Sequence, residues 1–446
     1  MRICFLIITL WGVLCSHPDE VVPVAEHYKL SITQLFALAD SNNRSIQAQA
    51  AAVAVSQEAV KVAKNAALPT VDAMVSFSYN GDGTITDRNF SHPFTAEIPS
   101  FGTNFSLEVT QIIYAGGAIR NGVAISELQA QLAALYAEGN RQDVRFMLVG
   151  YYLDLCKMQN QMQVLDRHIE QTEQMLAHMQ AKYDQGAALL NDITRYELQR
   201  EELRFQRIQM DHSIQIVSRQ LARALGLPAD TVFDTDAQEV ANLPGNSFQT
   251  TMTQNNAYWQ TKTTQEAVAL KTASTYIDIN RRAEKVARAG RLPQIALTAA
   301  DYLNGPITID IPAINKNFNY WFVGVGVKYP IGNLFKTHKE IKTRELAVQQ
   351  AMKQRDVLEE QLQTAVDAAF IRYTESFDLL ATKQKSEKLA QQNYEVVSYR
   401  YENDLALLTD LLDASAQKLD AELQSVNSQI NIVFNYYKLK HISGTL

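Results

Sequence analysis

Residues 155–192 decide the fold, and they read LCKMQNQMQVLDRHIEQTEQMLAHMQAKYDQGAALLND. Within them an apolar residue recurs at every seventh position, at Leu155, Met162, Ile169, Leu176 and Tyr183. Three places after the first four of these stand Met158, Leu165, Thr172 and Met179. Alternating steps of three and four are the pattern of helices wound as a coiled coil. Beyond Gly186 a second seven-residue series predicts the returning helix of an antiparallel hairpin, at Tyr196, Leu203, Met210, Val217 and Ala224.

The turn of this hairpin has a near copy later in the chain. Residues 183–192 read YDQGAALLND, and residues 401–410 read YENDLALLTD, 218 positions further on. The Leu-Pro pairs that end at Pro69 and Pro293 lie 224 positions apart. We therefore predict an internal two-fold repeat. The predicted boundaries are a first repeat over 17–228, a linker over 229–249 and a second repeat over 250–446.

The composition argues against several classes of protein. Hydrophobic residues make up 46% of the 446, which is too many for a disordered chain. Lys and Arg number 41 against 48 Asp and Glu, a net charge of −7, whereas nucleic-acid binding requires a basic surface. The eight histidines show no metal-ligand spacing, and the chain has no P-loop, dinucleotide fingerprint or nucleophile elbow. We expect no enzyme, no cofactor and no metal site.

Residues 1–16 have the features of a secretory signal. Arg2 precedes an apolar run over 3–14 that is short for a membrane-spanning helix. Two interpretations of the cleavage stay open: a signal peptidase cuts near Cys15, or Cys15 becomes the lipidated first residue of a lipoprotein. No later stretch approaches the roughly 18 apolar residues of a spanning helix, so we expect no transmembrane helix.

The period of the apolar residues changes along the first repeat. A helical pattern over 30–65, with Ser31 as a candidate N-cap, gives way to alternation over 71–80 and again over 105–110. A helix over 118–183 follows, and at 1.5 Å per residue it would extend roughly 100 Å. The first repeat therefore predicts a helix, two strands and a long helical hairpin.

The second repeat shows the same succession of patterns. A helix over 250–289 precedes alternation over 295–299 and 321–329, and a second long helix covers 335–401. Turn-rich loops separate the two strands of each pair. Four strands of alternating character are thus expected in the whole chain.

These four strands present one apolar face that no following helix covers. In an outer-membrane barrel, lipid-facing residues alternate with lumen-facing ones, and Tyr79, Trp321 and Tyr329 suit its aromatic rims. Four strands cannot close a barrel, since about eight is the practical minimum, so several chains must contribute. The alternative is a soluble four-stranded sheet that packs on its own helices.

The order helix, strand, strand, long helix, turn, helix, present twice, resembles the TolC-like outer-membrane efflux protein family (outer-membrane factors). The resemblance covers nearly the whole chain after the signal. It implies a mainly α-helical homotrimer in which antiparallel coiled-coil hairpins form an α-barrel. The four strands of each chain would contribute to a twelve-stranded β-barrel in contact with outer-membrane lipid. The localisation implied is the bacterial outer membrane, with the helical tunnel in the periplasm.

The resemblance also implies a function. The family forms the exit duct of tripartite efflux pumps and type I secretion systems, which conducts drugs, small molecules or proteins passively from the periplasm to the exterior. Each duct docks onto a periplasmic adaptor (membrane fusion) protein and, through it, an inner-membrane transporter that supplies the energy. The sequence does not name the cargo. A periplasmic coiled-coil tether without a channel is the alternative, and it predicts a protein that is soluble without detergent.

By the same resemblance, a pore gate lies where the hairpins turn. Asp410 and Asp413 match an aspartate pair of the second hairpin, Asp192 matches its counterpart in the first, and Tyr401 matches a tyrosine that helps to hold the tips shut. Three copies of each carboxylate would favour cations and raise some carboxyl pKa values. The family's arginine latch falls here on Ala406, so we expect the closed state to be held differently. That these aspartates merely solvate helical turns remains the alternative.

The resemblance further assigns the adaptor contact to the tips themselves. The matching positions are Gln185, Gly186 and Ala187 in the first hairpin and Asn403, Asp404 and Leu405 in the second. Gly186 would also serve as ordinary punctuation at a helix end, and the two roles are compatible.

Overall fold

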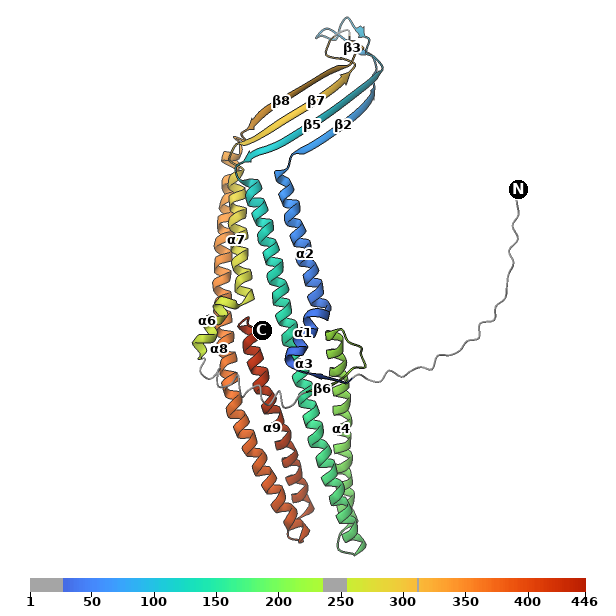
Figure 1. The fold of residues 1–446 in the computed structure, drawn as a ribbon, viewed down its shortest axis with the longest axis vertical. Coiled ribbons are helices and arrows are strands. Elements are labelled where there is room, and N and C mark those ends of the chain that lie inside the picture. The colour runs from blue at the N-terminus through green and yellow to red at the C-terminus, as the bar shows by residue number, and fades with distance from the viewer. Residues whose placement is uncertain (1–26, 236–254, 311–312) are drawn as a thin grey trace, which may run out of the picture.

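The computed structural model describes residues 27–235, 255–310 and 313–446. The predicted signal over 1–16, with Cys15, lies outside the described residues. Figure 1 shows a long, narrow molecule with a sheet at one end, helices along the body and two helical turns at the other end. The helices are α1 (Ile32–Asn42), α2 (Arg44–Lys64), α3 (Ala118–Asp184), α4 (Leu190–Leu225), α6 (Asn256–Glu266), α7 (Val268–Ala289), α8 (Asn333–Glu402) and α9 (Leu408–Ile442).

Two helices run nearly the whole length of the body. α3 has 67 residues and α8 has 70, which corresponds to about 100 Å each. Both were predicted from the sequence, and the structure confirms them within two residues of the expected bounds. In the described part of the chain, no helix combines the length and the apolar character that crossing a membrane requires.

The helices form one row rather than a closed bundle. α3 packs against α2 and α4 on one side and against α7 and α9 on the other, and α8 packs against α7 and α9. Figure 1 shows α2 above α4, and α7 above α9. The two shorter helices of each pair together span about the length of one long helix. The pair α2 and α4 therefore forms one edge of the row, and α8 forms the other edge.

Two predicted helices are each broken once, which corrects the sequence analysis. The helix expected over 30–65 starts after Ser31, which caps it, but it breaks at Asn43, where ψ is 124°. The Asn43 side chain accepts hydrogen bonds from Ser45 and Ile46 and donates one to the Ala224 carbonyl at 2.7 Å. The helix expected over 250–289 breaks at Ala267, where ψ is 117°. Tertiary contacts at these positions override a continuous helical pattern.

A short parallel strand pair crosses the middle of the molecule. β1 (His27–Leu30) pairs with β6 (Val232–Thr235). The first residues of the predicted linker over 229–249 are therefore ordered in this pair, and the described chain resumes at residue 255. Phe233 of β6 is buried in the main core, so the strand fixes the chain across the body.

Four long strands form one antiparallel sheet in the order β2-β5-β7-β8. They are β2 (Thr70–Tyr79), β5 (Phe101–Ala115), β7 (Gln294–Gly305) and β8 (Phe318–Lys328). β5 extends well beyond the predicted 105–110, with a bulge between Ile112 and Tyr114. It ends just before Gly116 and Gly117, where φ is 61° and 86°. Residues other than glycine disfavour such positive φ values. A small hairpin of β3 (Gly83–Ile85) and β4 (Phe94–Ala96) lies beyond the sheet.

The register gives the sheet two chemically different faces, because directly paired residues point to the same side. One row runs Val71, Val109, Ala299 and Val323, and the next runs Ala73, Leu107, Asp301 and Trp321. These rows belong to a mostly apolar face, on which Asp301 is the one charged residue of the four strands. Side chains on it remain exposed within the chain, for example Val75 at 57%, Val325 at 65% and Trp321 at 73%. The alternation predicted from the sequence is confirmed, and among the described residues no helix packs extensively on this sheet.

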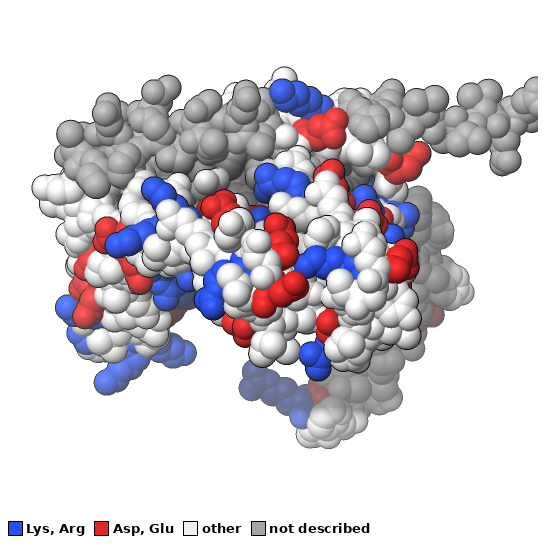
Figure 2. Space-filling model, turned by 90° about the horizontal axis from the view of Figure 1, so that it is seen from below, with Lys and Arg blue, Asp and Glu red and all other residues white. Residues whose placement is uncertain are grey.

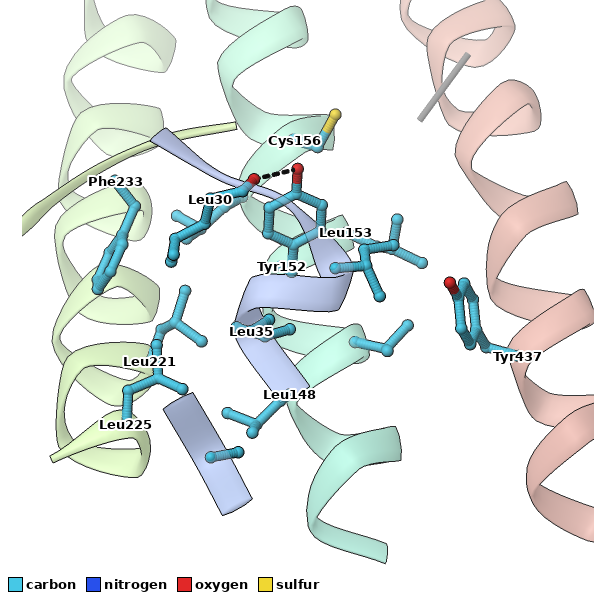
Figure 3. Packing of buried hydrophobic residues seen from close by; sticks show 14 of the residues in the cluster. Leu30, Leu35, Leu148, Tyr152, Leu153, Cys156, Leu221, Leu225, Phe233 and Tyr437 are labelled. Atoms are coloured by element: carbon cyan, nitrogen blue, oxygen red, sulfur yellow. Dashed lines mark hydrogen bonds between the residues drawn. The ribbon is translucent and has the colours of Figure 1, made fainter. Parts of the chain in front are cut away.

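The main hydrophobic core lies at mid-height, where the shorter elements meet α3. Figure 3 shows α1, α3 and α4 meeting there, with Leu221 and Leu225 of α4 near Phe233 and with Tyr437 of α9 at the far side. Tyr152 is fully buried, and its hydroxyl donates to the Leu30 carbonyl at 2.9 Å, which satisfies both polar atoms.

The lower part of α3 buries a more polar face than the predicted heptad implies. Met162 and Ile169 are only partly buried. The buried series with steps of three and four is Gln161, Leu165, His168, Thr172, Met175 and Met179. α9 contributes further buried polar residues, at Ser415, Lys418, Ser425 and Ser428. The contact between the two hairpins is thus substantially hydrogen-bonded.

A charged layer lies within this contact. His168 of α3 is 3% exposed, and its Nε2 lies 3.2 Å from a Glu422 oxygen of α9. Lys418 is 4% exposed, donates to Gln171 of α3 at 3.1 Å and lies 4.7 Å from the centre of the Tyr394 ring. Burial lowers the pKa of Lys418. Burial raises the pKa of Glu422, but the hydrogen bond and charge of His168, with Lys418, outweigh it and leave that pKa below its ordinary value.

We expect Glu422→Gln to lower the free energy of unfolding by about 1–3 kcal/mol, because Lys418 and His168 then stay buried without their charged partner. The measurement is urea unfolding of the purified protein in detergent at pH 7. Asp420→Asn on the exposed side of the same helix is the matched control and should change that free energy by less than about 0.5 kcal/mol.

The same pair of proteins should differ in their pH dependence. The lowered pKa of Glu422 contributes stability that is present above the ordinary value of 4.5 and is lost as pH falls through the lower folded-state pKa. The difference between wild type and Glu422→Gln should therefore shrink below about pH 4. A difference that stays constant down to pH 3 would contradict this role for the carboxylate.

Candidate functional site

The two hairpins end in the same kind of turn. We call residues 185–189 tip 1 and residues 403–407 tip 2. In tip 1, Gly186 has φ 74° and the Ala187 N–H donates to the Lys182 carbonyl at 2.8 Å. In tip 2, Asp404 has φ 60° and the Leu405 N–H donates to the Arg400 carbonyl at 2.7 Å. Both turns close their helices with a residue in the left-handed conformation, which glycine adopts readily and aspartate tolerates.

The residues predicted to meet an adaptor all lie in these turns. Each of them is exposed. They are Gln185, Gly186 and Ala187 of tip 1 and Asn403, Asp404 and Leu405 of tip 2. The structure thus brings the six positions to the end of the molecule that lies opposite the sheet (Figure 1).

A small hydrophobic cluster behind the tips joins all four helices of the two hairpins. Its buried members come from α3, α4 and α9, and partly buried residues of α8 pack against it. They are Met175, Leu176, Met179, Ile193, Tyr196, Leu408 and Leu411, with Tyr394, Val397, Tyr401 and Leu412 around them. This cluster fixes the two tips relative to each other, so side chains that extend from it are held in defined positions.

Tyr401 packs at the edge of this cluster, within electrostatic reach of Asp192. Tyr401 is partly buried, and burial raises its pKa, with a further contribution from the negative charges of Asp192 and Asp404. Burial also raises the pKa of Tyr196. Both tyrosines therefore stay neutral at physiological pH and can act as hydrogen-bonding groups beside the carboxylates.

Asp410 and Asp413 are placed differently from Asp192. Both are exposed on the first turns of α9, and their hydrogen bonds are local. Asp410 accepts from the Leu407 N–H at 3.2 Å, and Asp413 accepts from the Gln417 amide at 2.7 Å. The structure therefore places Asp192 within electrostatic reach of Tyr401 and leaves Asp410 and Asp413 exposed, with the Asp410 carboxylate capping its own helix.

A cross-tip contact that sequence reasoning missed involves Lys182. Its ammonium group donates to the Glu402 carbonyl at 3.0 Å and to an Asp404 oxygen at 3.3 Å, so it ties the end of α3 to tip 2. Ala406, where the family's arginine was expected, cannot make such a bond. The sequence carried only a weak signal, because a basic residue in the last turn of a helix is common for reasons of the helix dipole alone.

The charges on this end of the molecule are mixed. Figure 2 shows acidic and basic side chains interspersed over the view from the tips, without a large area of one sign. In the described parts of the chain, no group of three or more His, Cys, Asp or Glu residues could hold a metal ion. The arrangement can hold the tips by ionic and hydrogen bonds and can attract cations to its carboxylates.

Comparisons with known proteins agree with the sequence resemblance. The model of the family described as "Outer membrane efflux protein" matches residues 35–227 and again residues 259–445. The outer membrane efflux protein BepC of Brucella suis is 21% identical over 418 residues, which cover 93% of this chain and 86% of BepC. The outer membrane protein TolC of Vibrio cholerae is 19% identical over 424 residues, 93% of this chain and 91% of TolC.

Solved structures show the same fold. The outer membrane protein VceC of Vibrio cholerae superimposes with a TM-score of 0.73 at 14% identity, over 93% of this chain and 96% of VceC. CusC, described as forming a transmembrane channel, superimposes with a TM-score of 0.76 at 13% identity, over 93% of this chain and 92% of CusC. At these identities the structures establish the fold alone. Because the family model covers most of the sequence, in two matches, the chain belongs to the outer membrane efflux protein family.

Proposed function

We propose that three copies of this outer membrane efflux protein assemble into a passive exit duct. Their sheets would join into one twelve-stranded barrel in the outer membrane, and their helices would join into a tunnel in the periplasm. The observation that carries the proposal is the uncovered apolar face of the four-stranded sheet, which includes Val75, Val325 and Trp321. Lipid covers such a face, and barrel closure satisfies the edge strands.

Both edges of the chain are suited to contact another copy. β2 and β8 are the two outer strands of the sheet, and each has one unpaired edge. The helical row also has two open edges, and both carry exposed apolar side chains. On α2 and α4 these are Val55, Val62, Leu198, Phe205 and Ile216; on α8 they are Leu346, Val357, Ile371, Leu389 and Val396. A cyclic arrangement buries all of these edges against identical copies.

Two observations support an internal duplication as the origin of this shape. The family model matches each half of the chain separately. The helix breaks at Asn43 and Ala267 lie 224 positions apart, and the turns at Gly186 and Asp404 lie 218 positions apart. A duplicated unit explains why each half supplies two strands and one hairpin to the same body.

The tips support a periplasmic adaptor as partner, with an inner-membrane transporter behind it as the energy source. Apolar side chains project from both tips into solvent. They are Leu189 and Leu190 near tip 1 and Leu405 and Leu407 in tip 2, each between 60% and 70% exposed. Clusters of exposed apolar residues mark sites of protein–protein contact. In this assignment the six tip residues make the adaptor contact.

The gate follows from the contact between the hairpins. Above the hydrophobic cluster behind the tips, this contact contains polar residues, including Gln161 and Lys418, that can be hydrated when the hairpins part. That stretch would therefore separate at less cost than an apolar seam. Asp192 and Tyr401 belong to the closed arrangement, Lys182 latches it to Asp404, and Asp410 with Asp413 would face the narrowed tunnel. Opening the tips then requires no chemistry from this chain.

A planar lipid bilayer tests the duct directly. The purified protein should insert into the bilayer in one orientation and give discrete steps of conductance. A protein recovered in the soluble fraction without detergent, and silent in the bilayer, would instead support the coiled-coil tether.

Asp410→Ala with Asp413→Ala should weaken block of the channel by a multivalent cation. Loss of two carboxylates per copy removes charge from the narrowest part of the tunnel. The measurement is the blocking concentration of hexamminecobalt(III), which we expect to rise about tenfold, equivalent to about 1.4 kcal/mol.

The matched control for this experiment is Asp211→Ala. Asp211 accepts from the Gln215 amide at 2.7 Å, as Asp413 does from Gln417, but it lies about 30 Å along α4 from the tip. Equal blocking concentrations in the double variant and the wild type would remove these aspartates from the gate.

Lys182→Met and Asp404→Gly should each raise the fraction of time that the channel spends open. Asp404 is largely exposed, so we expect the contact to contribute about 0.5 kcal/mol per copy. Three copies together would shift the opening equilibrium by about tenfold. Glycine suits the left-handed turn at position 404, so Asp404→Gly removes the carboxylate without straining the backbone. Lys182→Arg keeps the charge and should stay closed; an open probability unchanged in all three variants would exclude the latch.

A further inference from the structure

The second face of the sheet carries a set of stacked aromatic rings that the duct itself does not require. Tyr302 of β7 stacks on Tyr320 of β8 with ring centres 5.2 Å apart and planes at 30°, and on Phe322 at 6.3 Å and 21°. Phe318 extends the stack, at 5.4 Å from Tyr320. We call these four residues the ring ladder. The rings stay accessible, since Phe318, Tyr320 and Phe322 are 40–52% exposed.

The register places the ring ladder on the face opposite the apolar one. Tyr320 pairs with Tyr302, Tyr302 with Ser106 and Ser106 with Met74, so these four side chains form one row. Trp321, between Tyr320 and Phe322 in sequence, belongs to the apolar face. If three copies close a barrel, as proposed above, the ring ladder lines its interior. Pairing of β8 with another copy covers the strand edge and leaves the ring faces accessible.

Two carboxylates lie in the row beside the rings. Asp72 pairs with Glu108, Glu108 with Ala300 and Ala300 with Phe322. Both acidic side chains are exposed, and like charges directly opposite each other on a sheet are unfavourable. Glu108 also accepts a hydrogen bond of 2.8 Å from the Tyr302 hydroxyl, which ties the carboxylates to the ring ladder.

The surrounding sheet supplies little positive charge to compensate. Across the four strands that the structure describes, Lys328 is the sole basic residue. It lies on the same face as the rings but three rows away, about 20 Å from Phe322 along the strand. The rows between contain Gly324 and Gly326, where an added Cβ would meet nothing within 4 Å. Open space therefore adjoins the aromatic and acidic residues.

We infer that this part of the barrel interior is a binding site for flat aromatic organic cations on their way out. Ring faces attract cations and stack on aromatic surfaces, and the carboxylates of Asp72 and Glu108 neutralise the charge. An aliphatic cation satisfies only the carboxylates, and an aromatic anion satisfies only the rings. The inference rests on the proposed duct, because only a closed barrel makes this face an interior.

Single-channel block in a planar bilayer tests the site, with each probe added on the sheet side. The probes are ethidium, a flat aromatic cation; tetrabutylammonium, an aliphatic cation; and 1-pyrenesulfonate, a flat aromatic anion. Ethidium should block with a residence time at least ten times that of either other probe. Tyr302→Leu with Tyr320→Leu should remove this preference, and Glu108→Gln should shorten the ethidium residence several-fold.

Trp321→Leu is the matched control, because it removes an aromatic ring from the same strand on the other face. It should leave the ethidium block unchanged. Should the double variant not form channels, Glu108→Gln, which preserves the volume of the side chain, carries the test.

The outcomes separate the two proposals. A protein without conductance overturns the duct and this site with it. A conducting channel that holds all three probes equally, or whose ethidium block is insensitive to both sets of changes, overturns the site alone and leaves the rings as cross-strand packing.

Discussion

The structure depends on one constraint: a sheet of four strands has an apolar face that none of the described helices covers. Burying a large apolar side chain is worth about 1.5–3 kcal/mol, so a face that carries valines, phenylalanines and Trp321 exposed to water is a considerable cost. Lipid removes that cost, but lipid tolerates no unpaired strand edges. In the duct proposed above, the open edges of β2 and β8 pair with other copies of the chain, which supply the remaining strands. The open edges of the helical row follow the same logic at the other end of the molecule.

A second feature is the change in the character of the packing along the molecule. The mid-height core joins α1, α3 and α4 through fully buried side chains such as Leu148, Tyr152 and Leu221. Below it, α3 meets α9 through His168, Glu422 and Lys418. Apolar contacts are costly to break, whereas hydrogen-bonded ones exchange for water at little net cost. The described chain thus has an apolar core at mid-height, a polar and charged contact between α3 and α9 below it, and a hydrophobic cluster behind the tips.

Much of the fold was predictable because it depends on periodicity. The change from helical to alternating patterns located the four long strands, and the seven-residue repeats located both hairpins within a few residues. The breaks at Asn43 and Ala267 were not predictable, because they depend on contacts with distant residues such as Ala224. The heptad also misplaced part of the buried surface of α3, since a search for apolar residues passes over buried Gln161 and His168.

The candidate site divides in a similar way. The repeated turn located both tips, because turn sequences encode local geometry, whereas the gate roles of Tyr401 and Asp192 rested on the family resemblance alone. Asp410 and Asp413 are exposed in the single chain, and a ring of carboxylates requires symmetry that no single sequence displays. The contact of Lys182 with Asp404 joins residues more than two hundred positions apart, and only the packed structure brings them together.

Disulfide trapping between the edges of the sheet tests most directly whether identical copies complete the barrel. Three double variants would be made, and each carries Ser76→Cys on β2. The second substitution, on β8, is Phe318→Cys in one variant, Gly324→Cys in another and Gly326→Cys in the third. The native Cys156 is buried and should not interfere. Oxidation in outer membranes should give, for at least one pairing, covalent dimers and trimers and nothing larger, as a closed ring of three requires. Chains that stay single in every pairing, or a ladder that continues beyond three copies, would contradict the account.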